Sequence, residues 1–190
     1  QNYAFEYCTS MTTITLADST EETTGVVLKG CTIGTQAFQY CSSIETIDMT
    51  GATVKLSAFA YCTSLKDVKM NLTTIPSSLF QGCSSLTTID LSNVTTIGSD
   101  AFHSTALGKV NLKNCTSIEQ QAFYNCANLT IVGNDLSKCS EIDRYAFCNC
   151  NSLEEIVLSG LIGAKSSSDI SSYAFCDCEN LKTVTYKCTD

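Results

Sequence analysis

The stretch "SAFAYCTSLKDVKM", Ser57 to Met70, decides the fold, because "QAFQYCSSIETIDM", Gln36 to Met49, repeats its pattern one interval earlier. All eight phenylalanines of the chain stand at the equivalent position, and the gaps between them are 33, 21, 21, 22, 21, 24 and 28 residues. A repeat of this length is typical of a solenoid, in which each unit contacts only its neighbours. The anchors are Phe5, Phe38, Phe59, Phe80, Phe102, Phe123, Phe147 and Phe175.

Apolar residues recur in register around each phenylalanine. From the second copy on, an isoleucine or valine stands five residues before it, and in every copy an alanine or leucine stands directly before it. Further apolar residues stand six, nine and eleven positions after it, except that the fifth copy is one residue short and the sixth reaches Leu136 after two extra residues. The alternation in "LTTIDL", Leu86 to Leu91, predicts a short strand with one buried face. The segment "AFQYC" predicts a short helical or 3-10 turn on the opposite side. In the sixth copy this spacing assigns Val132 to the buried column and Ile131 and Gly133 to the outward face.

These columns predict an α/β solenoid of about eight repeats, with one parallel β-sheet face and short helical turns opposite. One unit cannot bury its apolar face alone, so stacked copies at about 4.8 Å must share a core. We expect a single domain over residues 1–190, part of a longer array, with looped insertions at 17–30 and 159–171 that leave the same edge. Neither end shows a polar cap, so we also expect end-to-end or lateral association as one option.

The pattern A-F-x-x-C-x-x-L-x-x-I-x-L, with isoleucine five before the phenylalanine, resembles the BspA-type leucine-rich repeat. The resemblance covers nearly the whole chain and recurs in eight copies. It implies a right-handed leucine-rich repeat coil. It also implies a cell-surface or secreted location, since members of that family include surface proteins of bacteria and trichomonad-like protists implicated in adhesion to host proteins and cells.

Composition excludes several partners. A net charge of −8 with only 11 Lys and Arg opposes nucleic acid, which requires clustered basic residues. No apolar run is long enough to insert into a membrane. The only histidine, His103, has no second histidine beside it, and no catalytic, cofactor or metal motif is present, so we expect neither an enzyme nor a cofactor.

Thirteen cysteines fall into two groups. Seven stand three residues after a phenylalanine, where burial as free thiols explains their periodicity better than pairing, and Thr105 replaces the cysteine in the fifth copy. Four of the others lie at matching positions of adjacent copies, where a disulfide is one option for each pair. These two pairs are Cys115 with Cys139 and Cys148 with Cys176.

Four sequons offer possible glycosylation, at Asn71, Asn93, Asn114 and Asn128. The first three stand at one position of consecutive copies, so glycans on all of them would collide. The alternative is a column of asparagines that close turns through hydrogen bonds.

Function is expected on the outward side of the strands, which in solenoids is a continuous binding surface. Its residues are mixed in charge and suit a protein or glycan ligand, such as a host surface, better than a small molecule in a deep pocket. The resemblance makes an adhesin-like binding module the first hypothesis, and a structural spacer or self-assembling subunit the alternative. The candidate ligand-binding residues are Thr46, Asp48, Asp67, Lys69, Thr88, Asp90, Lys109, Asn111 and Glu155.

Overall fold

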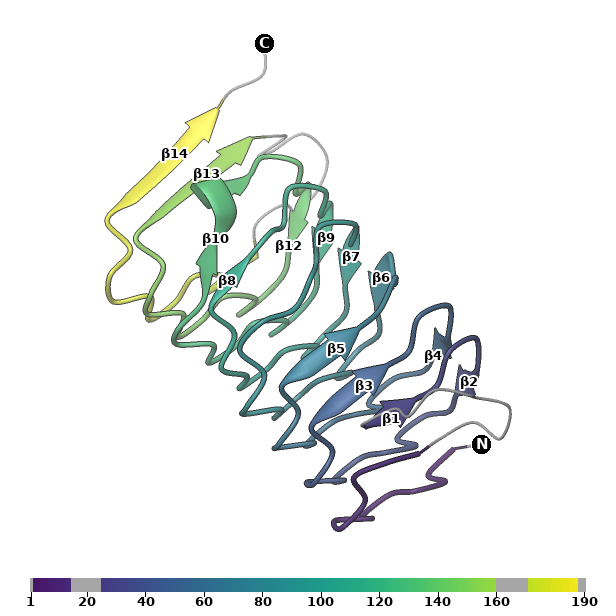
Figure 1. Ribbon diagram of the computed structural model, residues 1–190. Coiled ribbons are helices and arrows are strands. Elements are labelled where there is room, and N and C mark those ends of the chain that lie inside the picture. The colour runs from purple at the N-terminus through teal and green to yellow at the C-terminus, as the bar shows by residue number, and fades with distance from the viewer. Residues whose placement is uncertain (1, 15–24, 160–170, 188–190) are drawn as a thin grey trace.

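The chain winds into one elongated coil, with its first turns at one end and its last turns at the other (Figure 1). The computed structural model describes residues 2–14, 25–159 and 171–187 of the 190-residue chain. Short parallel strands lie along two sides of the coil, and the phenylalanine-bearing turns lie along a third. The fold is therefore a parallel β-solenoid, as the repeat predicts.

The strands that follow the phenylalanines form the first side of the solenoid, called here the sheet face. Hydrogen bonds join them in the orders β1-β3-β5, β10-β8 and β11-β13-β14. Ile47 pairs with Val68 and Ile156 pairs with Val184, so equivalent residues of successive turns stack on each other. The strands are β1 (Val26–Val27), β3 (Thr46–Asp48), β5 (Asp67–Lys69), β8 (Lys109–Val110), β10 (Thr130–Ile131), β11 (Asp135–Leu136), β13 (Glu155–Ser159) and β14 (Thr183–Lys187).

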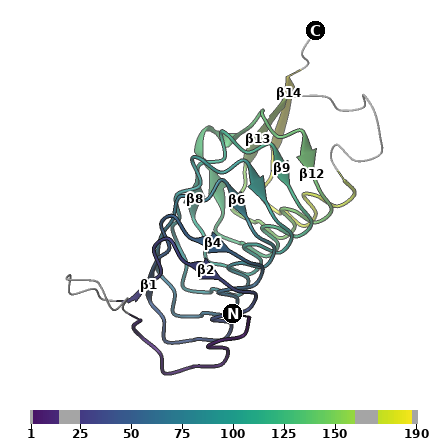
Figure 2. The same cartoon turned by 90° about the vertical axis from the view of Figure 1, so that its right-hand side faces the viewer.

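A second side carries strands that the sequence did not lead us to expect, since one sheet was predicted. They end at the isoleucine or valine five residues before each phenylalanine, and they pair in the orders β2-β4 and β12-β9-β7-β6 (Figure 2). In each, a polar residue precedes a buried β-branched residue, a combination that favours extended backbone. They are β2 (Thr32–Ile33), β4 (Thr53–Val54), β6 (Thr74–Ile75), β7 (Thr96–Ile97), β9 (Ser117–Ile118) and β12 (Glu141–Ile142).

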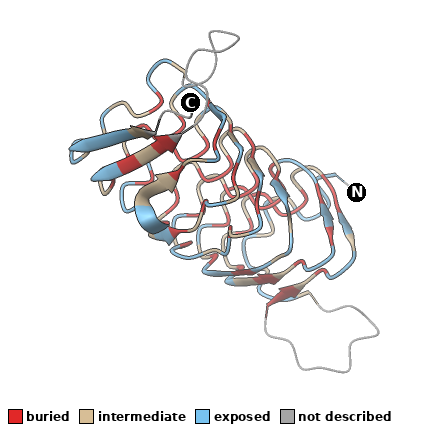
Figure 3. Ribbon diagram, turned by 90° about the horizontal axis from the view of Figure 1, so that it is seen from above, coloured by how far each residue is buried: buried red, intermediate tan, exposed pale blue. Residues whose placement is uncertain are grey.

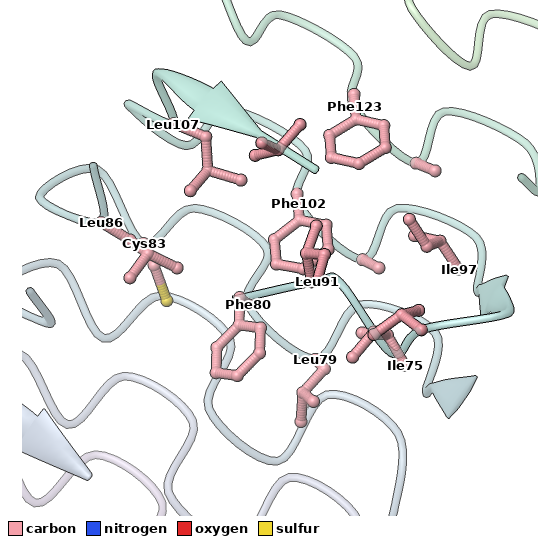
Figure 4. Close-up of a cluster of buried hydrophobic side chains, with 14 of the residues drawn as sticks. Ile75, Leu79, Phe80, Cys83, Leu86, Leu91, Ile97, Phe102, Leu107 and Phe123 are labelled. Carbon is pink, nitrogen blue, oxygen red and sulfur yellow. The ribbon is translucent and has the colours of Figure 1, made fainter. Parts of the chain in front are cut away.

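The core is a ladder of phenylalanine rings that runs the length of the coil. Neighbouring rings lie 5.1–6.3 Å apart between centroids, with interplanar angles of 2–18°. Buried residues line the inside of every central turn (Figure 3), and around Phe80, Phe102 and Phe123 the leucine and isoleucine columns close on the ladder (Figure 4). The five central rings are fully buried, whereas Phe5 in the first turn is 40% exposed.

The phenylalanine-bearing turns are not the short helices that we predicted. In the second copy Gln36 and Tyr40, two residues before and after Phe38, both have left-handed φ, at 53° and 62°. The N–H groups of Gln36, Phe38 and Tyr40 donate to carbonyls of the next turn, at 2.8–3.1 Å. Those of the intervening residues donate to carbonyls of their own turn. This alternation satisfies the backbone N–H groups of this turn, partly within the turn and partly through the next coil, so successive coils stack closely.

The first insertion contributes a strand where a loop was predicted. Val26 and Val27 of β1 pair with Ile47 and Asp48, and Ile14 forms an isolated bridge with Val26. The insertion therefore adds one rung to the sheet face, because its apolar run Val26–Leu28 can be buried against β3. The remaining parts of both insertions, and the edge from which we expect them to leave, lie outside the described residues.

The sixth copy corrects one predicted register. Ile131, expected to face outward, is 3% exposed and pairs with Val110, while Val132, expected inside, is 42% exposed. The single-turn 3-10 helix η1 (Val132–Asn134), with Gly133 at φ 67°, absorbs the two extra residues of this copy, and Leu136 then pairs with Leu158. Within the described residues no helix is long and apolar enough to cross a bilayer.

Candidate binding surfaces

Three of the candidate residues on the sheet face shape the turns that follow the strands. The carboxylate of Asp48 accepts hydrogen bonds from the N–H and hydroxyl of Thr50, and that of Asp90 accepts one from the N–H of Ser92 at 2.9 Å. Asn111 accepts one from the N–H of Lys113. Each is an asparagine- or aspartate-type turn that reverses the chain, so these side chains serve the fold first.

The charges on these two aspartates fit that structural role. Burial raises the pKa of Asp48, but hydrogen bonds from Thr50 and the Lys29 ammonium 3.4 Å away outweigh it, so the pKa lies below its ordinary value. Hydrogen bonds from Ser92 lower the pKa of Asp90. Both carboxylates are therefore held in the charged form at neutral pH.

Four other candidates are exposed, and no hydrogen bond or ion pair holds their side chains among the described residues. They come from three consecutive copies, and Asp67 and Lys69 belong to β5, beside β3. The remaining two candidates differ from these four: Thr46 is half-buried beside Gly25, and Glu155 is exposed but accepts a hydrogen bond from Asn134 at 3.4 Å. We call the open set the charged face; it consists of Asp67, Lys69, Thr88 and Lys109.

The sequence pattern predicted one continuous sheet, but the sheet is interrupted at the charged face. The segment that contains Thr88 and Asp90 has no strand pairing, so the ladder of hydrogen bonds stops at β5 and resumes at β8. Within this interval, the N–H of Gly108 in the fifth copy donates to the carbonyl of Thr87 in the fourth copy at 3.0 Å.

The seven-cysteine column forms a ladder of thiol hydrogen bonds. Each thiol after the first donates to the carbonyl of a phenylalanine in the preceding copy. That carbonyl also accepts the N–H of the residue three positions after it, which is Thr105 in the fifth copy and a cysteine in the others. Cysteine is small and apolar yet can donate, so it satisfies the second lone pair of a buried carbonyl. The donors, at 2.9–3.2 Å, are Cys41, Cys62, Cys83, Cys126, Cys150 and Cys178.

Burial makes these thiols unreactive. Desolvation raises the pKa of Cys41 and of Cys126 to about 11 and that of Cys83 to about 12. In the fifth copy, Thr105 is the substitute: its hydroxyl donates to the carbonyl of Phe102 at 2.9 Å and lies 3.3 Å from the sulfur of Cys126. Since only the thiolate is a nucleophile or a metal ligand, burial keeps these three thiols in the unreactive, protonated form at neutral pH.

The two pairs of additional cysteines differ. Cys148 and Cys176 are joined by a disulfide between the seventh and eighth copies. Cys115 and Cys139 are buried free thiols, and the thiol of Cys139 donates to the carbonyl of Cys115 at 3.2 Å. Its neighbour Cys115 and burial together raise the pKa of Cys139. The described residues contain one group with metal-ligand chemistry, Cys148, Cys176 and Asp177, and there the disulfide takes both sulfurs.

Two of the four sequon asparagines are engaged in hydrogen bonds between copies. Asn71 accepts one from the N–H of Gly51 at 2.7 Å, and Asn114 donates its Nδ2 proton to the carbonyl of Ser92 at 2.7 Å. Nδ2 is the atom to which a glycan would be attached. Asn71, Asn93 and Asn128 are exposed, whereas Asn114 is half-buried. Glycosylation therefore stays a prediction, and Asn114 is the sequon whose attachment atom is already engaged in a hydrogen bond of the fold.

A groove that the sequence did not predict lies on the phenylalanine-turn side of the last three copies. Its volume is about 450 Å³, and its lining includes the tyrosines Tyr124, Tyr145 and Tyr173. The signal available in the sequence was a tyrosine two residues before the phenylalanine in each of the last two copies, a position that the first copy also fills with Tyr3. His103, one copy earlier, lies 2.9 Å from Asp100 and tilts against Tyr124, as a half-buried packing residue.

The stacked strands and the apolar ladder between them define a leucine-rich repeat solenoid. The family model described as BspA type leucine rich repeat region matches six copies, over residues 1–130 and 92–189, and the chain belongs to that family. A comparison with curated proteins finds no significant match. The resemblance seen in the sequence is thus confirmed at the level of the family.

One solved structure supports the fold. The chain superimposes on a leucine-rich repeat protein of T. pallidum with a TM-score of 0.62 and 25% identity, covering 78% of this chain and 68% of that one. A leucine-rich repeat protein from Bacteroides ovatus has 16% identity and a TM-score of 0.32, over 98% of this chain and 70% of that one. A leucine rich cell surface protein from Faecalibacterium prausnitzii has 15% identity and a TM-score of 0.26, over 85% and 78%. Only the first superposition is close enough to support the fold.

Proposed function

We propose that this chain is a non-catalytic binding module of an extracellular, adhesin-like protein, and that it holds a protein or glycan partner through the charged face. The observation that supports this most is the separation of roles on the sheet face. The side chains of Asp48, Asp90 and Asn111 form hydrogen bonds within turns. The four residues of the charged face are exposed, and their side chains form no hydrogen bond or ion pair within the described part of the fold.

Two further features favour recognition outside the cell. Leucine-rich repeat proteins are generally protein-binding modules, and the solenoid supplies a rigid frame on which outward side chains keep fixed spacing. Disulfides such as Cys148–Cys176 persist mainly in oxidising compartments. The charged face carries both signs of charge, from Asp67, Lys69 and Lys109, which suits a polar protein or glycan surface.

The test is adhesion of protein-coated beads to cultured epithelial cells, with the double variant Asp67→Ala/Lys109→Ala. Neither side chain has a structural contact in the described fold, so the variant should fold normally and reduce adhesion at least tenfold. The matched control is Lys55→Ala, an exposed lysine that follows β4 on the other side of the solenoid.

Equal adhesion by the double variant and the wild type would contradict the proposal. The alternative, a structural spacer or self-assembling subunit, would be favoured if no cell or matrix surface retained the beads while the protein associated with itself. Sedimentation velocity over a range of concentrations separates these two functions, because self-association raises the sedimentation coefficient.

A further inference from the structure

We infer that the tyrosine-lined groove on the phenylalanine-turn side of the last three copies is a binding site for a linear, uncharged, β-linked saccharide. This surface is separate from the charged face, and the inference does not depend on the proposed function. It rests on how two columns of side chains run along the coil and what chemistry they offer between them. The groove is about 450 Å³ in volume and is lined by Gln121, Tyr124, Tyr145, Tyr173, Asp177 and the Cys148–Cys176 disulfide.

The groove runs parallel to the axis of the solenoid because its walls are two positions of the repeat. Gln121, Tyr145 and Tyr173 all stand two residues before a phenylalanine. Tyr124, Cys148 and Cys176 all stand one residue after it. Each turn of the coil therefore adds one equivalent pair of wall residues, and the groove presents a periodic surface rather than a single pocket.

Aromatic carbon covers two adjoining sides of the groove. Tyr145 and Tyr173 stack with centroids 5.3 Å apart and an interplanar angle of 16°. The ring of Tyr124 stands at 82° to that of Tyr145, with centroids 6.5 Å apart. A pyranose ring offers axial C–H groups on its flat faces and hydroxyls around its rim, so it fits a corner of this kind.

Polar groups at the rim can take the hydroxyls. Asp177 is exposed, and the sulfur of Cys148, which lies 3.9 Å from its Oδ2, has no proton to donate because it is part of a disulfide. Among the described residues, no hydrogen bond holds the hydroxyl of Tyr124 or Tyr173. A carboxylate, an amide from Gln121 and two phenol groups are planar donors and acceptors that match vicinal hydroxyls.

Spacing and charge favour a saccharide over other occupants. Side chains on one face of an extended peptide recur about every 6.6 Å, which falls out of register with tyrosines 5.3 Å apart. A β-linked pyranose unit in an extended chain is close to the coil repeat in length. A cationic ligand would compete with Arg144, whose guanidinium already lies over the rings of Tyr145 and Tyr173 at 4.8 and 5.6 Å. An anionic saccharide would meet Asp177 and a chain of net charge −8.

The disulfide keeps this surface rigid. It joins the seventh and eighth copies at the base of the groove, where Cys148 is buried and Cys176 is half-buried. A preformed groove loses less conformational entropy on binding than a mobile one. The pairing therefore holds Tyr145 and Tyr173 at a fixed spacing for the ligand.

The test is isothermal titration calorimetry of the whole chain with cellohexaose and with chitohexaose, each compared with its monosaccharide. At least one hexamer should bind saturably, and at least tenfold more tightly than its monosaccharide. Tyr173→Ala should weaken that binding at least tenfold, and Asp177→Asn should weaken it severalfold. Tyr173 is 60% exposed, so its removal should leave the fold intact.

The matched control is Tyr40→Ala, which removes a tyrosine from the separate stack Tyr7–Tyr40–Tyr61 in the first copies. This control, and the charged-face variant Asp67→Ala/Lys109→Ala, should bind the hexamer as the wild type does. Lack of binding to both hexamers would overturn the inference. Equal losses in Tyr173→Ala and Tyr40→Ala would overturn it as well, because they would indicate a general effect on the fold.

Discussion

At the scale of the residue, the cysteine column shows one amino acid that meets two demands. In the central copies, the position three after the phenylalanine is fully enclosed, yet it faces a carbonyl with an unused lone pair. A thiol fills the apolar space and donates to that oxygen. The sequence predicted burial of these cysteines from their periodicity, but not the hydrogen bond, because the partner carbonyl belongs to a different copy of the repeat.

This arrangement predicts loss of stability at alkaline pH. The pKa values of Cys41, Cys83 and Cys126 are raised in the folded state, so these thiols stay protonated there, whereas in the unfolded chain they ionise at about pH 8.5. The free energy of unfolding should therefore fall above that pH, by about 1.4 kcal/mol per pH unit for each such thiol, until the folded pKa of about 11–12 is passed.

Urea denaturation between pH 7 and 10.5 measures this dependence. Cys83→Ala should lower the free energy of unfolding at pH 7. It should also reduce the slope of that free energy against pH by the contribution of one thiol. The exposed-face variant Lys55→Ala should leave the slope unchanged. A slope identical in Cys83→Ala and wild type would show that this thiol ionises alike in both states.

At the scale of the element, the sequence predicted most strands of the sheet face and the rest less completely. The strand predicted at Leu86 to Leu91 was wrong, because the structure has no strand there. Strict alternation around Ile47 and Val68 placed those residues inside, as observed. The second column of strands was missed because a two-residue strand such as Thr74–Ile75 has no periodicity to detect. The burial of Ile131 was not predicted, because Ile131 and Val132 are adjacent and equally apolar. Only the pairing with β8 decides which of the two faces the core.

The binding residues were predictable in part. The outward positions follow from the alternation, so the charged face could be named, but the turn-forming role of Asp48 and Asp90 depends on backbone geometry after the strand. The tyrosine groove could not be predicted, since it requires two positions of the repeat to face each other across three turns of the coil.

The turn of the fourth copy in which Asp90 accepts a hydrogen bond from Ser92 predicts how stability changes at acid pH. The pKa of Asp90 is lowered in the folded state, so its contribution is present above the unfolded value of about 3.9 and is lost as pH falls below it. Asp90→Asn keeps the oxygen that accepts from Ser92, and it should show a weaker fall of melting temperature between pH 5 and 3. Asp90→Ala should cost about 0.5–1.5 kcal/mol at pH 7. Identical acid profiles for Asp90→Asn and wild type would contradict this role.

The tyrosine stack of the first copies depends on a glycine. Gly82 has a φ of 69°, and a Cβ there would lie 2.4 Å from the ring of Tyr61. Gly82→Ala should therefore lower the free energy of unfolding by about 1–3 kcal/mol more than the positive φ alone would. Gly51→Ala is the matched control, because Gly51 has a φ of 74° but its Cβ would meet nothing closer than 3.8 Å. Thermal denaturation compares them, and equal losses would show that Tyr61 moves aside freely.

At the scale of the whole molecule, the fold is a one-dimensional stack whose stability passes from each turn to the next. Within the phenylalanine ladder, each ring stacks on the ring before it and the ring after it, with centroids 5.1–6.3 Å apart. Such an array holds side chains at fixed intervals along its length, and that property underlies both the charged face and the tyrosine groove. Stacking in register is therefore the claim on which the proposed functions depend.

A double-mutant cycle on the ring ladder tests this claim most directly. Phe80→Leu and Phe102→Leu remove rings stacked 5.7 Å apart, and their effects on the free energy of unfolding should couple by about 0.5–1.5 kcal/mol. Phe80→Leu with Phe147→Leu removes rings separated by two intervening rings, and these effects should add within about 0.5 kcal/mol. Additive losses for Phe80 and Phe102, or equal coupling for both pairs, would contradict the stacked coil.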